Sequence, residues 1–187
     1  MCVVCLLPSI SIGEECGEAR FGSAAEAAEY LQHASAAVTP LVCAQKAFQR
    51  IAKATSEEAV PLLLQHLSFK RPLSEGEKHG IFMHGPTPDT LYPAVQALFT
   101  IGLPAESGLI GFLAHENNEN AVERSNALYA LLLIYHGNTL SVIENVMKAS
   151  KLTRDDSEGS RLRAAAREAA TTWCDDRIKE KCKEATR

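Results

Sequence analysis

Two histidines flank a short apolar run, Gly80–Met83, in the segment between residues 68 and 89. His79 and His84 are five residues apart, whereas two metal ligands on one helix face need a spacing of three or four residues. A spacing of five separates the side chains by about 140° around an ideal helix. No cysteine or set of carboxylates nearby would complete a metal shell. We therefore expect no metal or other cofactor, and we interpret both histidines as surface or capping residues.

The other candidate binding residues belong to the same segment or follow it directly. Lys70 and Arg71 form a dibasic pair where the segment begins, and such a pair receives a carboxylate or a phosphate. Phe82 lies between the two histidines, and Tyr92 begins the next helical pattern. The sequence predicts no catalytic, cofactor-binding or metal-ligating residue. The residues that it predicts to bind a partner are Lys70, Arg71, His79, Phe82, His84 and Tyr92.

The cysteines are numerous for a chain of this size: Cys2, Cys5, Cys16, Cys43, Cys174 and Cys182. Cys2 and Cys5 form a C-x-x-C pair, but no strand precedes them, as a redox motif requires, and no second pair completes a zinc site. Cys174 and Cys182 fall on one predicted helix, where eight residues span about 12 Å, too far for a disulfide between them. The sequence favours cysteines that act as small apolar residues or lie in tails. An exported protein with paired cysteines is the alternative.

The composition is typical of a soluble globular protein, with 187 residues, 46% hydrophobic and 22% charged. A net charge of -4 argues against a nucleic-acid partner. No apolar run reaches the roughly 18 residues that a membrane span needs. The first residues are apolar but lack a basic start, so a cytoplasmic protein is favoured. Export remains the alternative if the N-terminus is a truncated signal peptide.

Helical periodicity runs through most of the chain, and no segment alternates apolar and polar residues as a strand does. Ser23 and Ser74 each precede a glutamate three residues later, the capping box that begins a helix. Gly102 and Gly137 are expected to end helices. A short helix is predicted between Ser74 and Gly85. Apart from it we predict about seven to eight helices, at residues 23–33, 40–54, 57–67, 91–101, 104–115, 120–136, 139–150 and 160–183.

One predicted helical hairpin, Leu91–Leu113, recurs along the chain. Its apolar positions coincide with those of residues 47–63 after a shift of fifty, and with those of residues 131–143 after a shift of thirty-three. Helix pairs that recur at such periods are typical of solenoids. The phrases EEAVPLLLQHL and FTIGLPAESGLIGFL resemble the helices and the turn of a HEAT repeat. The chain therefore resembles HEAT and armadillo repeat proteins over about residues 39–150.

The resemblance implies an all-α fold, a short right-handed α-solenoid of antiparallel helix pairs. Residues 1–22 would form a poorly ordered tail and residues 23–187 a single domain, with an insertion at 68–89. HEAT repeats usually carry an aspartate in the turn, and the turns here, such as Thr55-Ser56 and Pro104-Ala105, lack it. The resemblance thus indicates the architecture and no functional subfamily.

Repeat proteins of this kind present a concave surface that binds a partner, usually a protein. The leading hypothesis is a non-catalytic scaffold or interaction module that uses this groove or the 68–89 insertion. A second hypothesis is a small enzyme or cofactor-handling protein, because some HEAT-like proteins act as bilin lyases. The sequence contains no phosphate-binding glycine loop, nucleophile elbow or HExxH motif that would favour an enzyme. A third is an exported structural protein. The oligomeric state is not predicted.

Overall fold

The computed structural model describes residues 21–35, 39–80, 85–115 and 120–187, and within these ranges the chain is helical throughout with no strand. The all-α prediction is confirmed. More helices are present than the seven to eight predicted, because some of the predicted helices are divided. In chain order they are α1 (Ala24–Gln32), α2 (Leu41–Ala52), α3 (Ser56–Leu64), α4 (Glu75–Lys78), α5 (Pro88–Leu91), α6 (Pro93–Ile101), the 3-10 helix η2 (Leu103–Ala105), α7 (Glu106–Ala114), α8 (Ala121–Ile134), α9 (Thr139–Leu152), α10 (Asp156–Trp173) and α11 (Lys179–Ala185).

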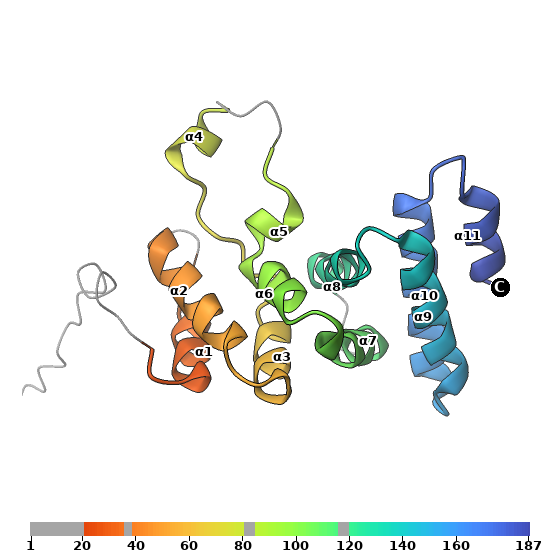
Figure 1. Ribbon diagram of the computed structural model, residues 1–187, viewed down its shortest axis with the longest axis horizontal. Helices are drawn as coiled ribbons and strands as arrows, with labels where there is room; N and C mark the ends of the chain where they lie inside the picture. The colour runs from red at the N-terminus through yellow and green to blue at the C-terminus, as the bar shows by residue number, and fades with distance from the viewer. Residues whose placement is uncertain (1–20, 36–38, 81–84, 116–119) are drawn as a thin grey trace, which may run out of the picture.

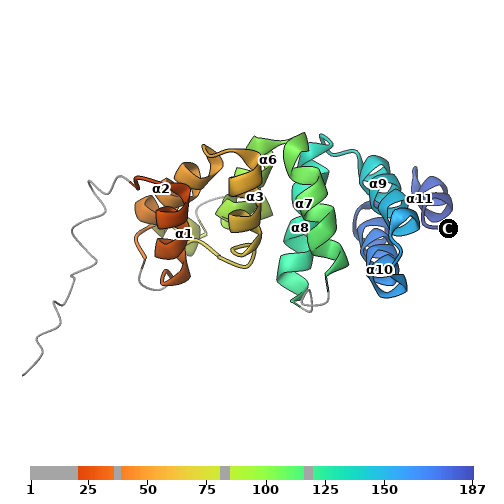
Figure 2. The same cartoon turned by 90° about the horizontal axis from the view of Figure 1, so that it is seen from below.

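The helices follow one another along the longest axis of the molecule, from α1 and α2 at one end to α11 at the other (Figures 1 and 2). Contacts connect them in two series. In one, α2 contacts α6 and α6 contacts α8. In the other, α1 contacts α3, α3 contacts α7, and α7 contacts α10. Each helix therefore packs mainly on its neighbours in the row.

Local signals begin and end these helices where the sequence predicts them. The Ser23 hydroxyl accepts a hydrogen bond from the backbone N–H of Glu26 at 3.1 Å, which caps α1. Ser74 and Glu77 form a complete capping box at the start of α4. Gly102 ends α6 with a φ of 75° and a ψ of -144°, a backbone conformation essentially restricted to glycine. The chain can therefore turn sharply from α6 into η2.

The core consists mainly of leucine, alanine and β-branched side chains contributed by most helices. Most of the apolar positions that recur at shifts of fifty and thirty-three belong to it, whereas Ile101 and Ile110 are partly buried and pack against it. Ile51, Leu98 and Leu131 are fully buried, and so are Leu109 and Val142. The recurrence thus includes residues that face the interior of the molecule. None of the described helices is by itself long and apolar enough for a membrane span, and only the bent pair of α6 with η2–α7, at 112°, meets the length and composition criteria jointly.

The C-terminal part of the chain differs from the prediction of one helix over residues 160–183. Asp155 accepts hydrogen bonds from the backbone N–H groups of Ser157 and Glu158, so α10 begins earlier, at Asp156. It ends at Trp173, and α11 begins at Lys179. The prediction of a single helix was wrong because the polar residues between them form a turn.

This turn reverses the conclusion about two cysteines. Cys174 and Cys182 form a disulfide with a Cα–Cα distance of 6.5 Å, because they lie on either side of the turn instead of along one helix. The prediction that they are too far apart was therefore wrong. Cys182 is buried, and α11 packs on α9. Cys43, buried in α2, is also disulfide-bonded.

The segment between residues 68 and 89 is partly helical, as predicted, but its helices differ from those expected. The helix predicted from Ser74 to Gly85 ends as α4 at Lys78, and Gly80 follows with a φ of 64°. The short helix α5, with Pro88 in its first turn, was not predicted. Of the predicted tail, residues 1–20 lie outside the described residues. Phe21, within the range predicted as a tail, packs on Tyr30 of α1, with ring centroids 5.3 Å apart.

Candidate partner-binding groove

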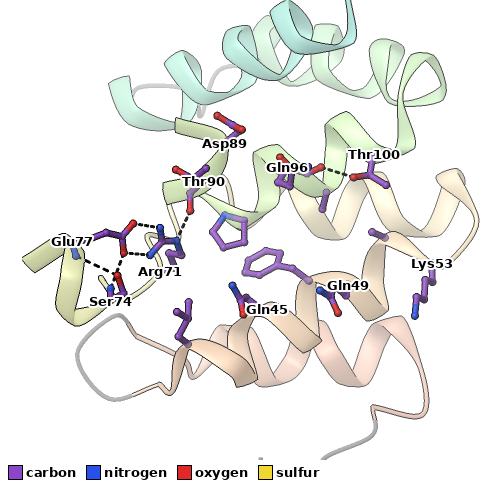
Figure 3. Close-up of a pocket in the computed structure, with 15 residues that line it drawn as sticks. Gln45, Gln49, Lys53, Arg71, Ser74, Glu77, Asp89, Thr90, Gln96 and Thr100 are labelled. Atoms are coloured by element: carbon purple, nitrogen blue, oxygen red, sulfur yellow. Dashed lines mark hydrogen bonds and ion pairs between the residues drawn. The ribbon is translucent and has the colours of Figure 1, made fainter. Parts of the chain in front are cut away.

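A pocket of about 680 Å³ lies where α2, α6 and the segment 71–90 meet (Figure 3). We call it the α2–α6 groove. Its walls come from two helices that are neighbours in space but fifty residues apart in the chain, and one end is formed by the segment before α6. The lining residues are Leu41, Gln45, Phe48, Gln49, Ala52, Lys53, Arg71, Ser74, Glu77, Asp89, Thr90, Pro93, Gln96, Ala97 and Thr100.

The floor of the groove is apolar and held in place from below. Phe48, Pro93 and Ala97 are buried. The ring of Phe48 packs on Phe69 at a centroid distance of 5.4 Å and meets the ring of His66 edge-on at 6.1 Å. Such aromatic contacts fix the orientation of the phenyl ring. The floor is therefore an apolar surface whose central ring, Phe48, is packed against neighbouring aromatic rings.

The walls carry neutral side chains that form hydrogen bonds. Gln45 and Gln49 are four residues apart, so they project from the same side of α2, and Gln96 and Thr100 share a side of α6 in the same way. Figure 3 shows the two pairs on opposite sides of the groove. The Thr100 hydroxyl donates to the backbone carbonyl of Gln96 at 2.9 Å. Within the described part of the chain, the three glutamine side-chain amides form no hydrogen bond.

Arg71 and Glu77 close one end of the groove with a two-pronged ion pair (Figure 3). Arg71 Nη1 donates to Glu77 Oε2 at 2.8 Å, and Nη2 donates to Oε1. Arg71 also donates to the backbone carbonyl oxygens of Thr90 and Pro72. The two side chains are only 10% and 14% exposed. Together with the bond from Arg71 to Thr90, this ion pair connects residues 71–77 with residues 89–91, and we call it the Arg71–Glu77 fastener.

The carboxylate of Glu77 is stabilised from two directions. Arg71 contributes the larger effect, and the hydroxyl and backbone N–H of Ser74 contribute the rest. The backbone N–H of Ser74 lies 2.7 Å from Glu77 Oε2. Hydrogen bonds to the ionised form lower the pKa of a carboxyl group, and here they lower the pKa of Glu77 to about 2. Glu77 is therefore an anion throughout the physiological range.

Asp89 connects the groove to α8. Its carboxylate accepts a hydrogen bond from Tyr129, and the pKa of Tyr129 is raised by burial, by the charge of Asp89 and by this hydrogen bond. The four charged residues of the lining are Lys53, Arg71, Glu77 and Asp89. Their charges cancel, so the groove is polar without a net charge.

Among the described residues that were predicted to bind a partner, only one lines this groove. Arg71 does so, but its donors are occupied by Glu77 and by backbone carbonyls, so it is not available to a ligand. Lys70 is exposed outside the lining. His79 is the exposed C-cap of α4, with Nε2 3.7 Å from Glu75 Oε2. Tyr92 is half-buried against the core.

Phe82 and His84 lie outside the described residues, so their role in binding a partner stays a prediction. Within the ranges that the structure describes, no group of three or more histidine, cysteine or acidic side chains is placed to hold a metal ion. His66 lies just after the end of α3 and is buried. Its Nε2 atom has no hydrogen-bond partner among the described residues.

The residues that the sequence did not single out are the glutamines of the walls. The sequence does contain a pattern that could have indicated them. Gln45 and Gln49 lie one turn apart on the exposed face of α2, next to the buried Phe48. That spacing alone describes an ordinary solvated face. Only the approach of α6, which brings Gln96 opposite, makes it a groove.

Comparison with known proteins found no matching family model, no similar curated protein and no similar solved structure. The class of protein is that of the described residues: they are all-helical, their helices are arranged in a row, and a neutral groove lies between α2 and α6.

Proposed function

We propose that this protein is a non-catalytic binding module, a short right-handed α-solenoid of antiparallel helix pairs similar to HEAT and armadillo proteins. Two observations support the architecture. Most of the apolar positions that recur at shifts of fifty and thirty-three residues are buried. The helices contact each other in two series along the row, as stacked helix pairs do.

We infer further that the module binds another protein in the α2–α6 groove. The observation that carries this inference is the combination of an apolar floor with neutral amides on both walls. A glutamine amide offers one acceptor and two donors, the same groups that a protein surface presents. A strongly charged small molecule is less suited, because the charges of the lining cancel.

The lining offers little to an enzyme. It contains no histidine or cysteine among the described residues, and Ser74 is occupied as the cap of α4. Arg71 and Glu77 neutralise each other, so neither is poised as an acid or a base. The cofactor-handling alternative predicted from the sequence therefore receives less support from this groove than protein binding does.

The proposed function is tested by a substitution that blocks the groove with a large side chain. Gln49→Trp places a large ring between the walls, and Gln65→Trp, an exposed position outside the groove, is the matched control. Each variant is immobilised and exposed to an extract of the source organism, after circular dichroism has shown that it is folded. We expect wild type and Gln65→Trp to capture the same protein and Gln49→Trp to lose it. Equal capture by all three would refute the groove as the site.

A second proposal concerns the compartment in which the protein works. The disulfide between Cys174 and Cys182, together with the disulfide-bonded Cys43, favours an oxidising compartment, as in the exported alternative. Protein isolated from its source with thiols blocked should gain one pair of hydrogen atoms per disulfide after reduction, measured by mass spectrometry. Six free thiols in that sample would contradict this proposal.

A further inference from the structure

The spacing of the glutamines on α2 matches the repeat of an extended peptide. Residues four apart on a helix are displaced by about 6 Å along its axis. Residues two apart in an extended chain are displaced by about 6.6–6.8 Å, and their peptide groups point the same way. Gln45 and Gln49 are therefore spaced to meet alternate peptide groups of one extended strand that runs along α2.

The opposite wall offers a further amide to the same strand. Gln96 faces α2 across the groove, one turn before Thr100 (Figure 3). The Thr100 hydroxyl donates within its own helix, which leaves its oxygen as an acceptor. A peptide between the helices would thus find amides on both sides, which suits the donors and acceptors that an extended main chain presents on both of its edges.

The floor selects the side chains of the occupant. In an extended chain successive side chains point to opposite faces, so every second residue would face Phe48 and Ala97, which are buried apolar groups. The intervening residues would face solvent. The side of α2 from Leu41 to Lys53 is about 18 Å long, which corresponds to about five extended residues.

The charges favour an occupant with a neutral middle and one negative end. At the end formed by Arg71 and Glu77 the two charges are paired. At the other end lies Lys53 (Figure 3), which forms no ion pair with any described residue. A single carboxylate beside Lys53 would complement it, whereas a charge elsewhere in the groove would meet only amides and apolar atoms.

From these observations we propose that the α2–α6 groove binds an extended peptide segment of about five residues that is uncharged except for a carboxylate at one end. Gln45, Gln49 and Gln96 bind its main chain, and a carboxylate at one end meets Lys53. This inference rests on the proposed function, since it specifies the part of the protein partner that enters the groove.

The experiment uses the full chain and a phage library of random linear heptapeptides as the probe. We expect enrichment of sequences with alternate apolar residues and one acidic end. The selected peptide, labelled with fluorescein, is then titrated with wild type and with Gln45→Met and Gln49→Met, which keep the side-chain length and remove the amide. Each change should weaken binding about three- to tenfold, the value of one neutral hydrogen bond. Gln65→Met, outside the groove, should bind like wild type.

Methylation of the peptide nitrogens separates main-chain recognition from side-chain recognition. Methyl groups on the alternate nitrogens that face α2 should weaken binding at least tenfold, because these nitrogens meet Gln45 and Gln49. Methyl groups on the other set, which faces α6, should weaken binding less, because that set meets Gln96. Lys53→Met should weaken binding and remove its dependence on salt.

Two results would overturn the inference: no enriched peptide, or a peptide whose affinity is unchanged by the methionine variants and by methylation. If the protein partner is still captured and still blocked by Gln49→Trp in that case, the proposed function stands and the occupant is a folded surface. If peptides bind as expected while Gln49→Trp captures the partner normally, the proposed function fails instead.

Discussion

The charged and titratable side chains of this protein are arranged to hold segments together more than to react. The sequence predicts that Arg71, beside Lys70, is available to a ligand. In the structure its guanidinium donates hydrogen bonds to Glu77 and to two backbone carbonyls. Because the arms of residues 71–77 and 89–91 depend on this pair, charge reversal at Arg71 would alter the shape of the groove and not merely its charge. Two predictions belong to this scale.

The first concerns the Arg71–Glu77 fastener in acid. The pKa of Glu77 is lowered from 4.5 to about 2, so the stabilisation that its carboxylate provides is present above about pH 4.5 and is lost as the pH falls through about 2. The protection of the backbone amides of residues 72–80, measured as the exchange rate relative to the intrinsic rate at each pH, should therefore fall between pH 4.5 and 2 in wild type. In Glu77→Gln this protection should already be low at neutral pH. Glu75→Gln, with an exposed side chain, should match wild type; identical profiles for all three would argue against the fastener.

The second concerns His66. Burial lowers the pKa of His66 below its usual 6.5, partly offset by a hydrogen bond with the backbone of Ala28. The fold therefore favours the neutral ring, and the stability is full above about pH 6.5 and declines as the pH falls through the lowered pKa. Thermal unfolding of wild type from pH 7.5 to 4.5 should show this decline. His66→Phe should reduce it, and His79→Gln, at an exposed position, should not. An unchanged pH profile in His66→Phe would show that another group causes the decline.

At the scale of elements, α7 can pack closely on α3 because Gly108 has no side chain. A Cβ atom at Gly108 would lie 2.4 Å from Cγ1 of Val60, closer than real contacts allow. Gly111, less than one turn further along α7, has nothing within 4 Å of such an atom and is exposed. A side chain is therefore excluded at Gly108 but has space at Gly111. The local sequence does not distinguish the two positions.

We expect Gly108→Ala to destabilise the protein by about 1–3 kcal/mol, the usual cost of overpacking. Gly111→Ala should stabilise it by about 0.5–1 kcal/mol, because alanine is the better helix former. Urea unfolding followed by circular dichroism measures both. Adding Val60→Ala to Gly108→Ala makes room for the new methyl group and should recover part of the loss. Equal effects of the two glycine substitutions would contradict close packing at Gly108.

At the scale of the whole molecule, α11 lies at one end of the row of helices (Figure 1). The last helix, α11, packs mainly on α9 and α10 and is fastened by the disulfide between Cys174 and Cys182. A cross-link that closes a loop of this size removes about 2–3 kcal/mol of chain entropy from the unfolded state. Loss of the bond should thus affect the end of the row first.

We expect Cys174→Ser with Cys182→Ser to raise hydrogen exchange in residues 175–187 strongly, while the helices near the groove keep their protection. The groove lies at the other end of the row (Figure 1), so binding to it should be unchanged. Hydrogen exchange with mass spectrometry resolves the two regions. Simultaneous loss of protection along the whole chain would mean that the row unfolds as one unit.

The sequence by itself determined the features that depend on neighbours in the chain. Ser23, Ser74 and Gly102 mark helix boundaries because a cap or a positive φ is decided within a few residues. Helical periodicity identified most of the core, since one stripe of each helix must be buried. The polar turn between Trp173 and Lys179 was missed, because its residues are also acceptable on a solvated helix.

Only the tertiary structure decided the groove. Gln45 becomes part of a wall because α6 brings Gln96 opposite to it, and Asp89 becomes an anchor because α8 places Tyr129 beside it. Arg71 changes from a candidate ligand site to a fastener because Glu77 and Thr90 converge on it. Each of these depends on a contact between segments that periodicity does not order in space. Cys174 and Cys182 depend likewise on a turn that brings two distant points of the backbone together.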